Sequence, residues 1–598
     1  MRSVTTPLLA GLTGCLAIGT IGAPTALAGT TPAAAVAAVS VSAPAATTGI
    51  AVKWDWTMPT FMVDKKTFVP TNDPSDPDWA KGGSYVPGPD GIPDRPMTEL
   101  SRYPNAGNAI YGALPRSARF AVTLDASASS GQGRLICHWS IRAGGRTYDA
   151  HGSCAKPTTV RLPEGKHMLE LKVTDKASGR SRTVASHLTV KNVLVAILGD
   201  SYGSGEGFPP FTEPNADGTG RQIDWDYAPC NRSRWSGFVR AAQMVESADK
   251  RSNVTLVDVA CAGGEVDKGY IRNIESTSPP VTVENPTGGI LYPKPRLKAN
   301  GVAVPGYEKP QVDQVRGITR GAPLDSVLLS IGGNDAGLSD IGIACALEDL
   351  AAPNCYNEVP FFWDKEPNAK PLYQVIDQNL VDLKKRYERM APCFGAAGTC
   401  RTTKLASGEP AKKATPSRPL ELVRAKNLVH VVYPDLTSTT VPGSSAIEPC
   451  TNKPLPQSPM NQIDNTWAFE ALYMGQAGTP YTLPDTWSPP LPLPDPAVIT
   501  PRGDGLAPLV RSNAKKYGWT PELGVMTESR GHGLCAPEAW EYGLTQAQFL
   551  TNPANPSGAL HPNDLGQAAY ADVVGPRAEQ LTGVPVKRWP TSPLNGRG

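Results

Sequence analysis

Apolar and polar residues along the chain follow two different patterns, one before and one after Lys191. Between residues 106 and 191, apolar and polar positions alternate in short runs that Gly, Pro, Asp and Ser residues separate. Alternation with a period of two is typical of strands that bury one face, and a series of such strands predicts an antiparallel β-sandwich. We therefore expect residues 106–191 to form a small β-sandwich.

After Lys191 the apolar runs become nearly continuous and rich in β-branched residues. Strands that are buried on both faces of a parallel sheet show this pattern. Helical patterns, such as RWSGFVRAAQMVE and YQVIDQNLVDLKKRYERM, lie between the runs, and alternating strands and helices predict an open α/β sheet in residues 192–590. The four runs are NVLVAILGDS (192–201), NVTLVDVACAGG (253–264), DSVLLSIGGND (325–335) and NLVHVVYPDL (427–436).

The remaining segments show neither pattern. Residues 1–28 contain Arg2, an apolar stretch of small residues and the small-x-small sequence Ala-Leu-Ala, which together predict a secretory signal peptide. Residues 29–48 are mostly Ala, Thr, Val and Ser and predict a flexible linker. Residues 49–105 are rich in Pro, Gly and Asp, and their structure stays open. Pro-rich stretches near 275–310 and 440–530 predict insertions over the α/β sheet.

Three short motifs in these segments allow a second interpretation. LTGC, which ends at Cys15, resembles a lipobox, although few apolar residues precede it. RGD at residues 502–504 matches an integrin ligand, but we interpret it as a surface-loop coincidence. Aspartates between residues 73 and 94 offer the oxygen ligands that calcium prefers, but Asp beside Pro or Gly is also ordinary turn chemistry. These aspartates are Asp73, Asp76, Asp78, Asp90 and Asp94.

Composition and charge narrow the function classes. The 598 residues exceed what one core usually holds, and the hydrophobic content of 40% and charged content of 19% are typical of folded globular domains. The net charge is only +2 and no long basic run occurs, which argues against a nucleic-acid partner or an electrostatic membrane anchor. No stretch after the signal peptide is long and apolar enough to span a membrane. We expect a secreted monomer.

The cysteines predict disulfides rather than metal binding. The chain has 11 cysteines, and setting aside Cys15 in the signal peptide leaves ten, an even number that suits an oxidising compartment. No C-x-x-C pair is present, so a zinc site is not expected. We expect up to five disulfides. Cys137 with Cys154 and Cys230 with Cys261 are the best candidate pairs, and the connectivity of the other six stays open.

Polar and glycine-rich motifs follow the predicted parallel strands. In an open α/β sheet, chemistry gathers at the carboxyl ends of the strands. The first three runs end in Gly199-Asp200-Ser201, in Cys261-Ala262-Gly263-Gly264 and in Gly332-Gly333-Asn334-Asp335. Near the C-terminus, LHPNDLGQAAYADVV places His561 directly before a helix that Asn563 or Asp564 caps. These four segments are therefore the candidate site.

The motif Gly199-Asp200-Ser201-Tyr202-Gly203 has three interpretations: a nucleophile elbow, a GDS block, or a plain glycine turn. Its spelling G-x-S-x-G is that of the nucleophile elbow of α/β-hydrolases, which requires further strands and an oxyanion loop upstream of the serine. Only the predicted sandwich precedes Ser201. We therefore interpret the motif as a GDS block at the end of the first strand of the sheet.

This set of residues resembles the SGNH, or GDSL-type, serine hydrolases over residues 192–590. Ser201, Gly263, Asn334 and His561 occur in the order of the four residues that name the family. CNRS after the first block, GHGLC and HPN resemble its secreted actinobacterial branch. The resemblance implies a three-layer αβα fold and hydrolysis without metal or cofactor. Residues 106–191 are similar to PKD or related immunoglobulin-like modules, which says little about function.

The resemblance also implies a role for each residue. A serine hydroxyl is a poor nucleophile until a base removes its proton, so Ser201 would be the nucleophile and His561 the general base. The oxyanion that forms needs fixed donors, which would be the N–H groups of Ser201 and Gly263 and the amide of Asn334. His532 is the main alternative base. His430 is interpreted as a core residue, and the other histidines, His138, His151, His167 and His187, lie in the predicted sandwich.

Two positions depart from the family pattern. Many members have Asp three residues before the histidine, where this chain has Gly558, so we expect a backbone carbonyl to orient His561 and consider Asp564 the alternative. Tyr202 stands where GDSL has Leu. Asp200 is expected to anchor the loop.

The sequence therefore predicts a secreted serine esterase or lipase that cleaves carboxylic esters through an acyl-enzyme. The substrate is an ester of a lipid or of an acylated carbohydrate, so a carbohydrate acetylesterase with the same machinery is the first alternative. A non-catalytic surface-binding protein on a hydrolase scaffold is the second alternative.

Overall fold

The computed structural model describes about half of the chain. The chain divides into Met1–Gly49 and Ile50–Gly598, and almost all described residues belong to the second unit. The predicted signal peptide and linker, Cys15, the five aspartates, the RGD motif and most of the two Pro-rich stretches lie outside the described residues. The main described ranges are 49–58, 119–207, 230–266, 310–319, 322–338, 340–342, 370–396, 427–440, 505–543 and 558–583, joined by short stretches and single positions.

Residues 119–190 form antiparallel strands around a hydrophobic cluster. One sheet has the order β1-β5-β8, and in the other β9 lies between β10 and β6, with β7 next to β6. Burial alternates along β6 and β9, as the period-two pattern predicts. Trp139 is 2% exposed and packs edge-on against Trp54. The strands are β1 (Asp55–Thr57), β5 (Phe120–Asp125), β6 (Leu135–Ala143), β7 (Arg146–Ser153), β8 (Thr158–Leu162) and β9 (Gly165–Asp175).

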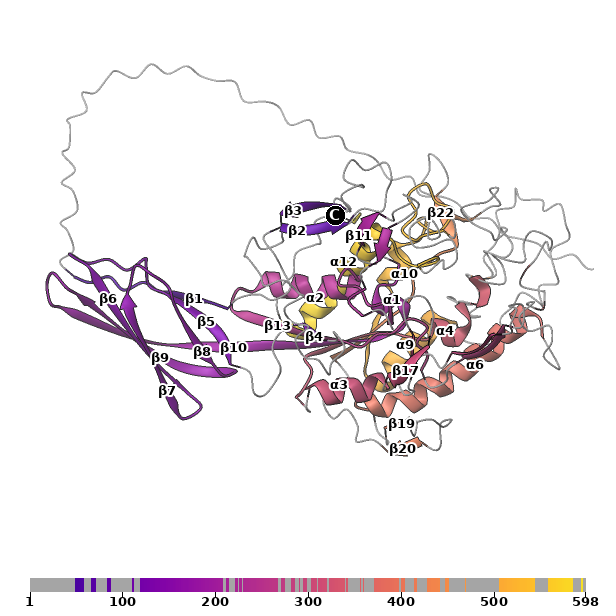
Figure 1. The fold of residues 1–598 in the computed structure, drawn as a ribbon, viewed down its shortest axis with the longest axis horizontal. Helices are drawn as coiled ribbons and strands as arrows, with labels where there is room; N and C mark the ends of the chain where they lie inside the picture. Colours follow the sequence, from indigo (N-terminus) through magenta and orange to yellow (C-terminus); the bar gives the residue numbers. More distant parts are fainter. Residues whose placement is uncertain are drawn as a thin grey trace, which may run out of the picture. The chain divides into compact units, whose positions relative to one another are not determined.

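Strand β10 (Ser181–Gly199) continues from the antiparallel strands into a parallel sheet (Figure 1). Its first part pairs antiparallel with β9 up to Val190, and from Lys191 onward it pairs parallel with β13. Burial changes at the same place, from alternating to continuous. The partner of the strand therefore changes where the hydrophobic pattern of the sequence changes.

The parallel part of the sheet has the order β13-β10-β18-β21-β24. Every residue of β13, β18 and β21 is buried, as the continuous apolar runs predict. Numbered by their order in the chain, the strands lie in the sheet as 2-1-3-4-5. In open α/β sheets of this order, ligands bind at the carboxyl ends of strands 1 and 3, which here are β10 and β18. The strands are β13 (Ser252–Asp258), β18 (Ser326–Ser330), β21 (Leu428–Val431) and β24 (Thr520–Glu522).

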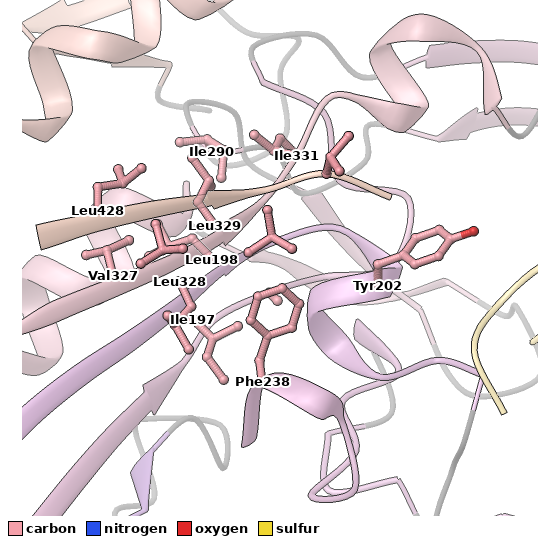
Figure 2. Packing of buried hydrophobic residues seen from close by; sticks show 14 of the residues in the cluster. Ile197, Leu198, Tyr202, Phe238, Ile290, Val327, Leu328, Leu329, Ile331 and Leu428 are labelled. Carbon is pink, nitrogen blue, oxygen red and sulfur yellow. The ribbon is translucent and has the colours of Figure 1, made fainter. Parts of the chain in front are cut away.

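Helices pack against this parallel sheet and give the chain its mixed α/β character. Ser236 caps α2 by accepting a hydrogen bond from Val239 N. Figure 2 shows Phe238 of α2 pointing into the same cluster as Ile197 and Leu198 of β10, and burying such a ring contributes about 1.5–3 kcal/mol. The helices are α2 (Gly237–Ala248), α3 (Gln311–Thr319), α6 (Leu372–Met390), α9 (Leu506–Tyr517) and α12 (Asp564–Thr582).

Short elements complete the described chain. Six antiparallel hairpins are formed by β2 (Lys66–Pro70) with β3 (Gly83–Pro87), β11 (Phe211–Pro214) with β12 (Arg221–Ile223), β14 (Tyr270–Ile274) with β15 (Val281–Asn285), β16 (Lys294–Leu297) with β17 (Ala303–Glu308), β19 (Arg401–Thr403) with β20 (Ala414–Pro416), and β22 (Ser438–Thr440) with β23 (Ile447–Pro449). Short helices are α1 (Ser201–Ser204), α4 (Gly333–Ala336), η5 (Ala391–Phe394) and α10 (Gly524–Glu528). No helix of the described residues has the length and apolarity needed to cross a membrane.

Three segments differ from the sequence-based boundaries. Strand β1 belongs to the antiparallel strands although composition left residues 49–105 unassigned. Strand β4 (Ile110–Tyr111) pairs with β13 of the parallel sheet, although the sandwich was expected to begin at residue 106. Helix α9 and strand β24 lie inside the expected insertion 440–530, yet β24 pairs with β21. These strands have only two or three residues, too few to show a hydrophobic period.

The structure contains both disulfides that the sequence predicted, Cys137–Cys154 and Cys230–Cys261. Two further disulfides join cysteines whose pairing the sequence left open, Cys393–Cys400 and Cys450–Cys535.

Candidate active site

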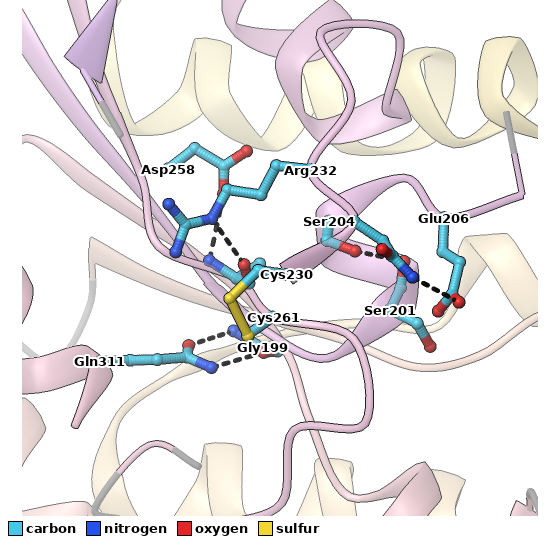
Figure 3. The surroundings of a disulfide bond; sticks show 11 residues. Gly199, Ser201, Ser204, Glu206, Cys230, Arg232, Asp258, Cys261 and Gln311 are labelled. Atoms are coloured by element: carbon cyan, nitrogen blue, oxygen red, sulfur yellow. Dashed lines mark hydrogen bonds between the residues drawn. A yellow bond between two sulfur atoms is a disulfide. The ribbon is translucent and has the colours of Figure 1, made fainter. Parts of the chain in front are cut away.

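Ser201 is the first residue of α1 and follows the carboxyl end of β10. Asp200 caps this helix, since its Oδ1 accepts a hydrogen bond of 3.1 Å from Tyr202 N. Gly199 has a φ of +141°, and a Cβ there would lie 2.0 Å from Ser330 O, so the turn requires glycine. Gln311 holds the same residue through two hydrogen bonds of 2.7 Å, one to Gly199 N and one to its carbonyl (Figure 3). The turn that carries the serine is therefore fixed from both sides.

His561 lies in hydrogen-bond contact with Ser201. The distance between His561 Nε2 and Ser201 Oγ is 2.6 Å, although 360 positions separate the two residues. His561 Nδ1 is 2.7 Å from the carbonyl oxygen of Ala559. A carbonyl oxygen only accepts, so Nδ1 carries the hydrogen and the lone pair of Nε2 faces the serine hydroxyl. Ser201 is 6% exposed and the His561 side chain 17%, so both groups are largely shielded from bulk water.

The loop before His561 is held in an unusual conformation. Leu560 has a φ of +65°, which non-glycine residues rarely adopt. Tyr202 donates a hydrogen bond of 2.5 Å to Leu560 O, and its ring lies 4.9 Å from the His561 ring. Tyr542 N donates to His561 O at 3.0 Å and fixes the other side of the loop. Tyr202, which departs from the GDSL spelling, therefore supports the histidine directly.

Among the described residues, no carboxylate contacts His561 Nδ1. Asp564 points elsewhere, because its Oδ1 accepts a hydrogen bond of 2.6 Å from Arg240. Asn563 caps α12, with its side chain accepting from Gly566 N. The backbone carbonyl of Ala559 is the partner of His561 Nδ1.

Gly263 and Asn334 follow β13 and β18, the two strands that flank β10, and their loops lie close together. Asn334 Nδ2 donates a hydrogen bond of 3.0 Å to Gly264 O. Gly263 has a φ of +72°, so a side chain at this position would be strained. The Cys230–Cys261 disulfide and a hydrogen bond of 3.1 Å from Ala262 N to Cys230 O hold the loop (Figure 3). The loops after β13 and β18 therefore bring Gly263 and Asn334 to one place.

Asp200 connects the serine turn to the Asn334 turn. Its Oδ2 accepts a short hydrogen bond from Tyr433 OH, and Tyr433 OH in turn accepts from Gly333 N at 2.8 Å. Burial raises the pKa of Asp200 to about 7. Asp200 thus has the anchoring position that the sequence predicted for it.

Sequence reasoning assigned no role to two residues that shape the site. Asp335 accepts from Val266 N at 3.0 Å and pairs with Arg386 at 2.6 Å, which fixes the loop of Gly263. Glu206 lies beside the catalytic candidates, with Oε2 3.7 Å from His561 Nε2. Asp335 is the last residue of the GGND motif and Glu206 directly follows GDSYGSG, and these positions were the only signal in the sequence.

The other histidines do not contact Ser201. The ring of His532 stacks on Trp540 with centroids 4.2 Å apart, and its Nδ1 lies 3.0 Å from Glu538 O. His430 is fully buried in β21, and burial lowers its pKa to about 4. Within the described ranges, no three His, Cys, Asp or Glu side chains are grouped so that they would hold a metal ion.

Comparisons with known proteins add little to this geometry. No protein-family model matches the sequence, and no curated protein matches it either. Among the solved structures, a carbohydrate acetylesterase from Xanthomonas citri is similar at 12% identity over 37% of this chain, with a TM-score of 0.12. The match spans about half, 49%, of that structure. A likeness at this level carries no argument, so the function has to be inferred from the site.

Proposed function

We propose that this chain is a serine hydrolase of carboxylic esters with SGNH-type machinery. Ser201 is the nucleophile and His561 the general base. The observation that carries the proposal is the 2.6 Å contact between Ser201 Oγ and His561 Nε2, with Ala559 O holding the opposite ring nitrogen. A nucleophile within hydrogen-bond reach of a base that a third group orients is the geometry this chemistry requires.

The first half of the reaction forms an acyl-enzyme. Ser201 Oγ attacks the ester carbonyl while His561 Nε2 takes the hydroxyl proton. The imidazolium that forms keeps its Nδ1–H on Ala559 O, at 2.7 Å. When the tetrahedral intermediate collapses, Nε2 gives the proton to the leaving alkoxide. Water, activated by the same nitrogen, then hydrolyses the acyl-enzyme.

Three donors are proposed to stabilise the oxyanion. The N–H of Ser201 lies in the first turn of α1, where an α-helix leaves its N–H groups without partners inside the helix. Gly263 contributes a second N–H, and the contact of Asn334 with Gly264 O supports placing the amide of Asn334 beside it. Loss of one such donor typically costs about 10²–10³ in rate.

The rest of the chain fits a secreted enzyme. We propose the three-layer αβα fold for residues 192–590, which the parallel strand order β13-β10-β18-β21-β24 supports. We propose a PKD-like or immunoglobulin-like module for residues 106–191, supported by their antiparallel strands. The disulfides are consistent with an extracellular location, to which the predicted signal peptide at residues 1–28 would direct the chain.

A fluorophosphonate probe tests the nucleophile. The wild-type protein should be labelled at Ser201, and Ser201→Ala should abolish both labelling and hydrolysis of p-nitrophenyl acetate. Ser512→Ala, on the exposed side of α9, is the matched control and should keep both. Folded wild-type protein that neither reacts with the probe nor cleaves the ester would favour the binding-protein alternative.

Acyl length then separates lipase from acetylesterase. p-Nitrophenyl esters from acetate to long-chain acids are compared by kcat/KM. A flat or rising profile removes the acetylesterase alternative, whereas a steep fall with chain length removes the lipase.

A further inference from the structure

Glu206 is built into the turn that carries the nucleophile. Its backbone N–H donates a hydrogen bond of 3.1 Å to Ser201 O, five positions earlier. Gly207, the next residue, packs so closely on the histidine loop that a Cβ there would lie 2.6 Å from His561 Cβ. The backbone of Glu206 is therefore fixed relative to both Ser201 and His561.

The side chain of Glu206 is also held in one orientation. Its Oε1 accepts a hydrogen bond of 2.8 Å from Asn231 Nδ2. Asn231 follows Cys230 of the disulfide and has a φ of +48°, a conformation that its packing has to maintain. Figure 3 shows the carboxyl group of Glu206 and the hydroxyl of Ser201 on the same side of α1.

The carboxylate faces the nitrogen that exchanges protons with the substrate. Its Oε2 is 3.7 Å from His561 Nε2, beyond hydrogen-bond distance but within ion-pair distance once Nε2 takes up a proton. The Glu206 side chain is only 14% exposed, so water screens it incompletely. Within the described part of the chain, no lysine or arginine lies within ion-pair distance of Glu206.

The leaving group of an ester has to pass close to this carboxylate. His561 Nε2 delivers its proton to the leaving oxygen, so that oxygen comes within hydrogen-bond reach of Nε2. A group 3.7 Å from Nε2 therefore borders the leaving-group side of the site. A negative charge on the leaving group would be repelled there, whereas a neutral alcohol or a cationic group would be tolerated.

We infer that Glu206 is a specificity-determining residue that restricts the enzyme to esters with neutral or cationic leaving groups. Esters of uncharged alcohols and sugars are then substrates, and esters whose alcohol part carries a phosphate or carboxylate are disfavoured. This inference rests on the proposed esterase function and narrows its substrate class.

The experiment compares methyl 4-acetoxybenzoate with the 4-acetoxybenzoate anion, two acetates that differ in the charge of the leaving phenol. Each kcat/KM is divided by the rate of hydroxide hydrolysis of the same ester, which removes intrinsic reactivity. The wild-type enzyme should prefer the neutral ester by about tenfold at low salt. Glu206→Gln, which keeps an acceptor for Asn231, should lower this preference to about threefold or less.

Glu388→Gln is the matched control, since it removes the same charge from an exposed position of α6 and should leave the preference unchanged. Raising the ionic strength should reduce the preference of the wild type but not that of Glu206→Gln. An equal preference in wild type and Glu206→Gln, while Ser201-dependent hydrolysis persists, overturns the inference alone. Absence of hydrolysis of both esters by the wild type overturns the esterase proposal, and the inference with it.

Discussion

The antiparallel strands of residues 119–190 and the parallel sheet that follows share one strand but bury polar residues differently. Along β9 every second residue faces outward, so polar side chains such as Lys172 stand in solvent along the whole strand. Along β18 all residues are buried, and the polar side chains of the site follow only after its end, at Asn334 and Asp335. When a strand is buried on both faces, polar groups can reach a substrate only at its ends.

The difference also concerns how the two regions are stabilised. The antiparallel region depends on local cross-strand packing around Trp139, with the Cys137–Cys154 disulfide beside it. The site depends on contacts between segments far apart in the chain, such as Tyr202 with Leu560. Changes in the first region should therefore alter stability alone, whereas changes in the second should alter activity or the local electrostatics of the site. Four predictions test this division, beginning with the largest effect.

The largest effect is expected for His561→Gln. Without the base, Ser201 keeps its proton in the attack, and kcat/KM for p-nitrophenyl acetate should fall by about 10⁴-fold or more. His532→Gln is the matched control, because His532 stacks on Trp540 and does not contact Ser201. Equal activity losses in the two variants would show that the site is not where we place it.

The second prediction concerns the core of the antiparallel region. Trp139→Ala removes a side chain that is 2% exposed and should lower the free energy of unfolding by about 3–5 kcal/mol. Hydrolysis per folded molecule, measured well below the unfolding temperature, should stay within about twofold of wild type. Loss of activity in the still-folded variant would show that β10 transmits the defect to Ser201.

The third prediction compares the two predicted disulfides. Replacing either pair by serines should cost about 2–4 kcal/mol of stability. Only Cys230→Ser with Cys261→Ser should also lower kcat, by about tenfold with little change in KM, because this disulfide holds the loop of Gly263. Unchanged kcat after loss of Cys230–Cys261, or reduced kcat after loss of Cys137–Cys154, would contradict the division.

The fourth prediction concerns the pH dependence of stability. Burial raises the pKa of Asp200 from 3.8 to about 7, so between these values the folded state holds a proton that the unfolded state has released. The contribution of this residue to stability is therefore complete below pH 4 and declines as the pH rises to about 7, by at most about 1.4 kcal/mol per pH unit.

Asp200→Asn should flatten this decline, measured by chemical unfolding at several pH values. Asp175→Asn is the contrasting variant from the antiparallel region, since hydrogen bonds from backbone N–H groups lower the pKa of Asp175 below its usual value. Its removal should not flatten the decline between pH 4 and 7. An Asp200→Asn variant with the slope of wild type would show that Asp200 is ionised throughout this range.

Much of the fold was predictable because the burial of a strand determines the hydrophobic pattern of its own residues. The change from alternating to continuous apolar residues at Lys191 marks where β10 changes partners. Two disulfides and the residues at the strand ends were also found from sequence. Strand β24 was not found, because three residues with Pro521 in the middle show no period.

By itself, the sequence determined which segments are buried strands and which residues stand at their ends. Only the tertiary structure decided what these residues touch: Ala559 O rather than Asp564 at His561, Tyr202 under the histidine loop, and Glu206 beside Nε2. The physical reason is the distance along the chain over which each property is determined. Hydrophobic periodicity is set within a few residues, whereas a hydrogen bond across 360 positions depends on how every intervening element packs.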